Sequence, residues 1–422
     1  MNAPSPPPSP PARRIPTEFR YAERLGEPRT QRIRESFRKL LHFDPVLDDS
    51  IVRRYAETYY DADPVAEAFV EEVYLPRGQA AGRALLDQAL ERGVESIPDA
   101  PASLRALFAE VEQPPPWYDE ALAERGARAI RRYGTHYFSF AGAVTLESYK
   151  DSSVAKPLSF TGAYAGESAQ RRFLETVAFW LDVTTPGAMR PGGKGRKTAL
   201  RVRIMHVFVR RRLLAHPRWD LEAWGVPISQ ADALLTLLAG SVGAGLGLQK
   251  LGYRTSKEDI EAMMHFWRYV GHLMGVQPPW YPANYEDGAR LMFTSMIKGA
   301  GLAGDDGVTL ARSYVASYAP KEGTAPWPAL LRKIEHGIEL GYTHFFLPPK
   351  TFRAFGLPAP GLWRLHPFAQ FPLIFALETV RARVPVVDEL CLSLARTRAE
   401  RWLASHLGPR RAEYKAVESF TR

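Results

Sequence analysis

The stretch Thr198–Leu214, TALRVRIMHVFVRRRLL, decides the fold class and contains the most informative residues of the chain. Read at 3.6 residues per turn, it places Arg203, His206 and Arg210 on one stripe that is otherwise apolar. The remaining arginines of the stretch point roughly the other way. The pattern therefore predicts a helix that buries an imidazole between two guanidinium groups.

Buried cations of this kind need partners. Removing two guanidinium groups from water without anions would cost several kcal/mol, so the fold must supply carboxylates or the propionates of a haem. The same charges disfavour an imidazolium at His206, and a neutral imidazole is a competent metal ligand, for example below a haem iron. The alternative is a core histidine that bonds a backbone carbonyl, with both arginines paired to acids elsewhere.

Helical periodicity recurs along nearly the whole chain, and proline-rich joints interrupt it. Alternating strand patterns are sparse, so the predicted fold class is all-α. Residues 1–16 form a proline-rich tail that we expect to be disordered, and residues 17–422 form a single helical domain. Three long patterns are each predicted as one helix: Asp119–Phe140, Ser229–Leu251 and Phe371–His406.

Composition narrows the classes further. The single cysteine, Cys391, excludes intrachain disulfides and cysteine-ligated zinc or iron–sulfur sites, and it suits a cytoplasmic location, as does the lack of a secretory signal. No apolar run approaches the ~20 residues of a membrane span, which leaves peripheral membrane contact open. The net charge is +9, but its arginines are scattered and no nucleic-acid-binding motif is present, so we expect no nucleic acid partner.

The glycine-rich run Gly240–Gly247 resembles a dinucleotide-binding loop only superficially. It lies inside an apolar helical pattern and does not follow a strand, which such a loop requires. Close helix packing against a flat cofactor explains these small residues better.

Three segments resemble one known family. Arg203-Ile-Met-His206-Val-Phe-Val-Arg210 is similar to the R-x-M-H-x-x-x-R core of the latex clearing protein (rubber oxygenase) catalytic-domain family, which includes the ER-bound mycophenolic-acid-pathway oxygenase B proteins. The segment 171–180 is similar to the distal helix of that family, and the segment 255–275 to its W-R-x-x-G-x-L-x-G helix. The motif-bearing core spans about residues 133–353. The resemblance implies a globin-like helical core with additional surrounding helices.

The resemblance also implies roles for individual residues. His206 would be the proximal ligand of the iron of a haem b. Arg203 and Arg210 would bind the propionates or the proximal hydrogen-bond network. Three further residues would belong to the haem pocket: Arg172, Thr176 and, with slightly different spacing, Thr236.

Glu175 marks the clearest departure from the family pattern, because rubber-cleaving members carry a lysine at this position, immediately before the distal threonine. A carboxylate here could be a weak iron ligand, a general base or a partner for Arg172. The catalytic glutamate of the family precedes the distal helix, where Glu147 and Glu167 are both candidates. We favour Glu147, an acidic residue in an apolar segment, although a surface or capping role would fit it equally.

Together these features predict a haem b-dependent oxygenase. It would use dioxygen on an apolar unsaturated substrate, such as an isoprenoid, polyisoprene or a lipid-like molecule, by oxidative cleavage of a C=C bond. The alternative is a non-catalytic haem-binding or sensor protein with the same fold, in which Glu175 blocks productive chemistry.

Overall fold

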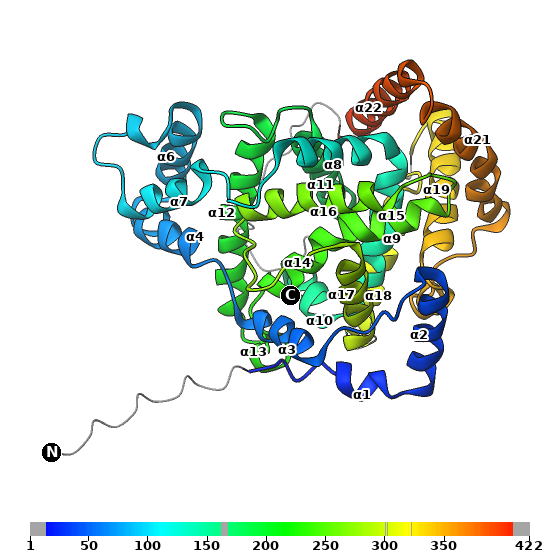
Figure 1. The fold of residues 1–422 in the computed structure, drawn as a ribbon, viewed down its shortest axis with the longest axis horizontal. Helices are drawn as coiled ribbons and strands as arrows, with labels where there is room; N and C mark the ends of the chain where they lie inside the picture. Colours follow the sequence, from blue (N-terminus) through cyan, green and yellow to red (C-terminus); the bar gives the residue numbers. More distant parts are fainter. Residues whose placement is uncertain (1–13, 162–167, 300, 302, 322, 408–422) are drawn as a thin grey trace.

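The computed structural model describes residues 14–161, 168–299, 301, 303–321 and 323–407, and every regular element in these ranges is a helix (Figure 1). The predicted all-α class is therefore confirmed. Most of the proline-rich tail predicted over residues 1–16 lies outside the described residues.

The N-terminal third forms the lower edge and one flank of the molecule in Figure 1. Its elements are α1 (Tyr21–Leu25), α2 (Pro28–Leu41), α3 (Asp49–Glu57), η1 (Thr58–Tyr60), α4 (Pro64–Phe69), η2 (Val70–Tyr74), α5 (Leu75–Arg77), α6 (Gln79–Arg92), η3 (Val94–Ser96) and α7 (Ala102–Glu112).

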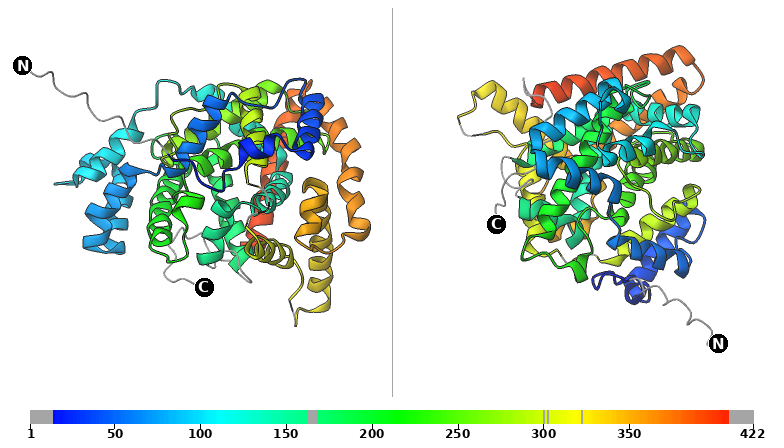
Figure 2. Two further views of the ribbon diagram at one scale, coloured as in Figure 1. Left: turned by 90° about the horizontal axis from the view of Figure 1, so that it is seen from below. Right: turned by 90° about the vertical axis from the view of Figure 1, so that its left-hand side faces the viewer.

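The central helices form the body. They are α8 (Glu120–Tyr133), α9 (Thr135–Ser148), α10 (Ser152–Thr161), α11 (Ser168–Thr184), α12 (Lys194–Leu214), α13 (Leu221–Trp224), α14 (Gln230–Leu238), η4 (Ala239–Gly243), α15 (Ala244–Gln249), α16 (Lys257–Leu273), α17 (Tyr285–Lys298) and α18 (Asp305–Ala316). The C-terminal helices cover the flank opposite α6 (Figures 1 and 2). They are α19 (Pro326–Phe346), α20 (Pro349–Ala354), η5 (Gly361–Leu365), α21 (His366–Arg381) and α22 (Pro385–Leu407).

Helix α16 is the central element of the core, and its apolar side chains, including Met263, Phe266 and Val270, are almost fully buried. It packs on α8, α12, α14 and α17. The contact with α8 is backbone-close, because a Cβ on Gly126 would lie 2.1 Å from the carbonyl oxygen of Ala262. Such close packing around one buried helix positions the neighbouring α12.

The three long predicted helices are each interrupted. The first breaks at Gly134, whose φ of +52° separates α8 from α9. The second contains the π-helical segment η4 between α14 and α15. The third is two helices, since α21 starts at His366, before the predicted Phe371, and α22 starts anew at Pro385, a residue suited to the first turn of a helix.

The second of these patterns also corrects the expectation that no apolar run is long enough to cross a membrane. Gln230–Gln249 meets the length and composition of a span, the one helix among the described residues to do so, but 56% of its most apolar window is buried inside the protein. A buried core helix meets the same criterion, so the finding is weak evidence for a span.

Protein side chains, not a flat surface, fill the space beside the glycine-rich run. A Cβ on Gly245 would lie 2.5 Å from Cγ1 of Ile260, and one on Gly247 would lie 2.1 Å from Cε2 of Phe140. Gly245 and Gly247 therefore allow close packing of α15 against α16 and α9, respectively.

Candidate active site

Two consecutive helices, α11 and α12, carry most of the predicted site residues. Near their joint the side chain of Thr198 donates to Oδ2 of Asp182 at 3.2 Å, and Nζ of Lys194 lies 2.7 Å from the other oxygen of that carboxylate. A helix rises about 1.5 Å per residue, so Glu175 and His206 lie roughly 10 and 12 Å from this contact along their own helices. The hairpin thus places the two motif segments at comparable levels on neighbouring helices.

Arg203 is buried against carboxylates from two other helices. Its Nε donates to Oδ2 of Asp63 at 2.6 Å and its Nη2 to Oδ1 at 2.8 Å, while Nη1 forms an ion pair with Glu110 at 2.8 Å. Asp63 also caps α4 by accepting from the backbone of Ala66. Burial alone would lower the pKa of Arg203, but its hydrogen bonds to Asp63 and the charges of both acids raise it.

Gly275 leaves room for this ion pair. Its φ is +76°, and a Cβ there would lie 2.1 Å from Oδ2 of Asp63 and 2.7 Å from Nε of Arg203. Gly275 ends the segment 255–275 that resembles the family. Its missing side chain leaves space for the ion pair of Arg203, which belongs to the segment 203–210.

Arg210 is also buried and bound to protein groups. Its Nη1 donates to Glu67 at 3.0 Å, and its Nε and Nη2 donate to the backbone carbonyls of Pro227 and Ile228 at 3.0 and 2.9 Å. The face predicted from the sequence is thus confirmed, since Arg203 and Arg210 are buried whereas Arg211 is much more exposed. The sequence left two kinds of anion open as partners, carboxylates and haem propionates. The structure shows a carboxylate at each of the two arginines.

His206 lies between these anchors and is partly buried. Burial, and secondarily the charge of Arg210, lowers its pKa to about 4, and Asp63 opposes this shift. The sequence predicted that both arginines disfavour the imidazolium, and this is only partly met. Burial is the largest cause of the lowered pKa, and of the two arginines only Arg210 contributes to it. The charge of Arg203 is compensated by Asp63 and Glu110. In the described part of the chain His206 has no hydrogen-bond partner, so its neutral imidazole retains a free lone pair.

The predicted site residues on α11 are held by contacts within their own helix. Both oxygens of Glu175 are engaged, one by Nε of Arg171 at 3.3 Å and the other by Nη1 of Arg172 at 3.0 Å. The hydroxyl of Thr176 donates to the carbonyl oxygen of Arg172 at 3.1 Å. Of the three roles considered for Glu175, the structure shows the partner of Arg172.

Glu147 lies at the end of α9, separate from this cluster. One of its carboxylate oxygens pairs with Nζ of Lys150, whereas the other is buried and has no hydrogen-bond partner in the structure as described. Its competitor Glu167 lies outside the described residues. A buried carboxylate oxygen without a partner is an acceptor available for a proton or a ligand group.

Thr236 lies on α14, where it is exposed and donates to the carbonyl oxygen of Asp232 at 2.9 Å. The structure therefore brings together Arg172, Glu175 and Thr176 on α11. It shows no hydrogen bond or ion pair from either Thr236 or Glu147 to that cluster within the described ranges.

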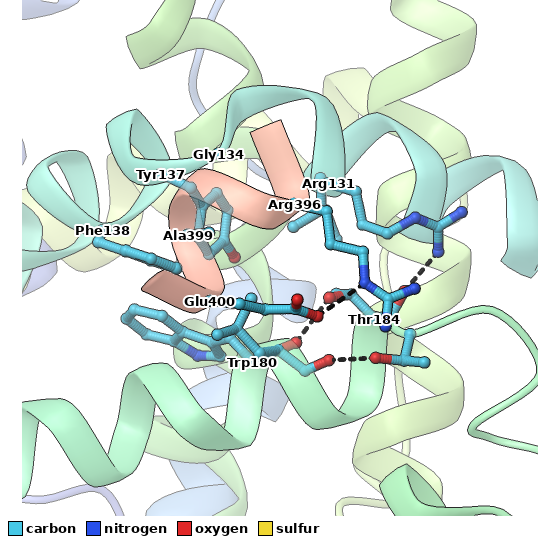
Figure 3. A pocket seen from close by; sticks show the side chains of 12 residues that line it. Arg131, Gly134, Tyr137, Phe138, Trp180, Thr184, Arg396, Ala399 and Glu400 are labelled. Atoms are coloured by element: carbon cyan, nitrogen blue, oxygen red, sulfur yellow. Dashed lines mark hydrogen bonds and ion pairs between the residues drawn. The ribbon is translucent and has the colours of Figure 1, made fainter. Parts of the chain in front are cut away.

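One pocket borders α11 near its C-terminal end (Figure 3). Aromatic side chains, among them Tyr137, Phe138 and Trp180, line it, and α22 closes it. Its polar groups are already paired, as Arg396 is with Glu400 at 2.7 Å. Because none of the predicted site residues lines this pocket, we do not place the active site there.

The sequence did not reveal the acids that hold α12. Asp63 and Glu67 are 140 and 143 positions away from their arginines, and Glu110 lies on yet another helix. The sequence Asp63-Pro64 predicts the start of a helix. The ion pair of Asp63 with Arg203 cannot be predicted in this way, because it depends on tertiary structure.

Comparison with known proteins identifies the class. Residues 130–377 match the model of a family of oxygenase catalytic domains. The match covers more than half of the chain, which therefore belongs to the family described as ER-bound oxygenase mpaB/B'/Rubber oxygenase, catalytic domain. The predicted resemblance is confirmed.

Individual relatives agree with this assignment. The chain is 28% identical over 232 residues to the rubber oxygenase of Streptomyces sp. (strain K30), which covers 54% of this chain and 55% of the relative. The chain thus spans about half the length of this curated relative. The solved structure of latex clearing protein LCP in the closed state has a TM-score of 0.61 and 21% identity, over 81% of this chain and 91% of that one. This match shows that the helical fold is shared.

Proposed function

We propose that this protein is a haem b-dependent oxygenase that uses dioxygen to cleave a C=C bond of an apolar substrate, and that His206 would hold the iron of the haem. The observation that carries the proposal is that the imidazole of His206 has no hydrogen-bond partner among the described residues and belongs to a helix fixed by buried ion pairs. Burial lowers its pKa to about 4, which agrees with a neutral ligand. Membership of the oxygenase family supports it.

The residues present fit such a cofactor on the proximal side. A haem iron takes its axial ligands from the protein, so one available imidazole suffices. No group of three or more histidine, cysteine or acidic side chains that could hold a metal ion occurs in the described ranges, and a haem needs none. Bound haem would supply the redox chemistry with dioxygen that amino-acid side chains lack.

The arginines contribute indirectly in this proposal. Arg203 and Arg210 are already bound to Asp63 and Glu67, so they fix the position of α12 and thereby orient His206. They belong to the proximal network that surrounds the ligand.

We assign proton transfer to Glu147 because one of its carboxylate oxygens has no hydrogen-bond partner among the described residues. Its unpartnered buried oxygen can accept a proton, whereas both oxygens of Glu175 are neutralised by arginines. Arg172 and Thr176 would shape the distal side, together with Thr236 on α14.

The substrate class follows from the family and from the name of the Streptomyces relative, a rubber oxygenase. We therefore propose an isoprenoid, polyisoprene or a lipid-like alkene as substrate, and carbonyl compounds as products.

The test is oxygen uptake and carbonyl formation by the purified protein with polyisoprene latex and with a short isoprenoid. We expect uptake that depends on the alkene, and a loss of about 10²–10⁴-fold in turnover in Glu147→Gln with haem content unchanged. Glu95→Gln, at an exposed position, is the matched control. Stable haem without uptake on any alkene would favour the non-catalytic haem-binding or sensor function instead.

A further inference from the structure

Helix α21 is attached to the body by a narrow stripe. Only Pro367, Ile374 and Glu378 of this helix are buried. Large apolar side chains cover the remainder of its surface and continue into η5. We call this surface the α21 face and define it by Leu362, Leu365, Phe368, Phe371, Leu373 and Phe375, of which Leu362 and Leu373 are 83% and 71% exposed.

This composition is unusual for a helix in contact with water. The segment Leu365–Leu377 contains no acidic residue, lysine or arginine, and the pKa of its single histidine, His366, is lowered by burial and by the charge of Arg398. A helix that is apolar on all sides is normally buried in a core or a membrane. An apolar segment of about 10–14 residues that is not in a core is typical of the membrane interface.

Charge favours lipid as the covering partner. The segment Pro349–Leu377 contains Lys350, Arg353 and Arg364 but no aspartate or glutamate. Arg364 lies in η5 between Leu362 and Leu365, whereas Lys350 and Arg353 lie on α20. All three cations are exposed and have no ion-pair partner in the described part of the chain. Basic side chains beside an apolar surface attract anionic headgroups.

The neighbouring helices also expose large apolar side chains. Helix α21 packs against α19 and α22, and the three helices occupy one flank of the molecule (Figures 1 and 2). Trp327 on α19 is exposed, as are Val386 and Leu390 on α22.

We propose that the α21 face docks this protein onto the surface of a membrane that contains anionic lipid, with α21 lying in the interfacial plane. A second copy of the chain is a poorer partner, because pairing two such faces would bring two sets of unpaired cations together. The proposal concerns a surface away from His206 and does not depend on the haem.

The experiment is co-sedimentation of the full chain with vesicles of phosphatidylcholine alone or mixed with phosphatidylglycerol. We expect stronger binding to the mixed vesicles, and weaker binding to them as salt is raised. Leu373→Glu and Phe368→Glu should each weaken binding by about tenfold or more, since each places a charge in the apolar contact. Leu75→Glu is the matched control and should bind as the parent does, because Leu75 is exposed on α5, which packs against α6 on the opposite flank (Figure 1).

Arg364→Ala separates the two contributions. It should weaken binding to vesicles that contain phosphatidylglycerol and leave binding to pure phosphatidylcholine unchanged. Thermal unfolding of each variant confirms that the fold is kept, as expected for exposed positions.

Two results would overturn the proposal. One is the lack of binding of the parent protein to both kinds of vesicle. The other is a parent that sediments as a dimer without lipid and becomes a monomer in Leu373→Glu, which would show that a second copy covers the α21 face.

Discussion

The two helices of the candidate active site are held in opposite ways. On α12, Arg203 and Arg210 bind acids from other helices, some 140 positions away in the sequence. On α11, Glu175 binds arginines three and four positions away in the same helix. Helix α12, which carries His206, is therefore part of the tertiary framework, whereas the Glu175 cluster on α11 is held locally.

This difference predicts where substitutions act. Changes at the buried ion pairs of α12 should affect folding first, because an unpaired charge would remain in the interior. Changes at the Glu175 cluster should cost less stability, because Glu175 is buried but its arginines remain in contact with water, so that removing its charge leaves no unpaired charge in the interior.

The largest effect is expected at the pair between Arg203 and Asp63. Arg203→Ala should lower the free energy of unfolding by about 3–5 kcal/mol, because it leaves Asp63 buried without its partner. Urea unfolding measures this loss, with Arg211→Ala as the control, which should change stability by less than about 1 kcal/mol. Equal losses in both variants would remove the distinction between the two faces of α12.

A similar loss of stability is expected at Gly275, where the backbone leaves space for the ion pair of Arg203 and Asp63. Gly275→Ala combines a left-handed φ, which costs about 1–3 kcal/mol, with a collision against the Asp63 carboxylate. Gly192→Ala is a matched control, because Gly192 has φ +74° and a Cβ added there would meet nothing within 4 Å. Unfolding should show the greater loss for Gly275→Ala, and a smaller loss there would contradict the packing described.

The pH dependence of stability should report the state of His206. Its pKa is about 4 in the folded protein and about 6.5 when unfolded, so the unfolded chain binds the proton first as pH falls. The stabilisation present above pH 6.5 is therefore lost between about pH 6.5 and 4. In the haem-free protein, His206→Asn should show a shallower loss over this interval, while His136, whose pKa is also about 4, contributes equally to both proteins. Identical pH profiles would show that the imidazole is not held neutral.

The smallest effect on stability is expected at Glu175. Glu175→Gln keeps the shape of the side chain and should change the free energy of unfolding by less than about 1 kcal/mol, with haem content preserved. The lost charge should alter the visible spectrum or the pH dependence of oxygen reactivity. Glu175→Lys, which restores the residue type of the rubber-cleaving relatives, should favour a six-coordinate, nitrogen-ligated iron. If neither variant changes the spectrum or turnover, Glu175 is only a structural partner of Arg172.

The sequence alone revealed what depends on local periodicity. The inward face of α12 could be predicted because a buried stripe repeats at helical spacing. The pairing of Glu175 with Arg172 was one of three roles that the sequence left open, and the structure shows it because the two residues lie one turn apart. The carboxylates that bind Arg203 and Arg210 could not, since their proximity arises only when α4 and α7 pack on α12.

The helix joints show the same limit. The break at Gly134 interrupts a pattern whose apolar residues continue on both sides, so periodicity alone indicates one helix. The break before Pro385 carried a local signal, because a proline inside a long helical pattern usually marks a boundary.

The most direct test of the central assignment is the visible spectrum and iron content of the purified protein and of its His206→Ala variant. The parent should show a strong Soret band and about one iron per chain, and the folded variant should lose stable haem. A parent that takes up no haem, or a variant with full occupancy and an unchanged spectrum, would contradict it.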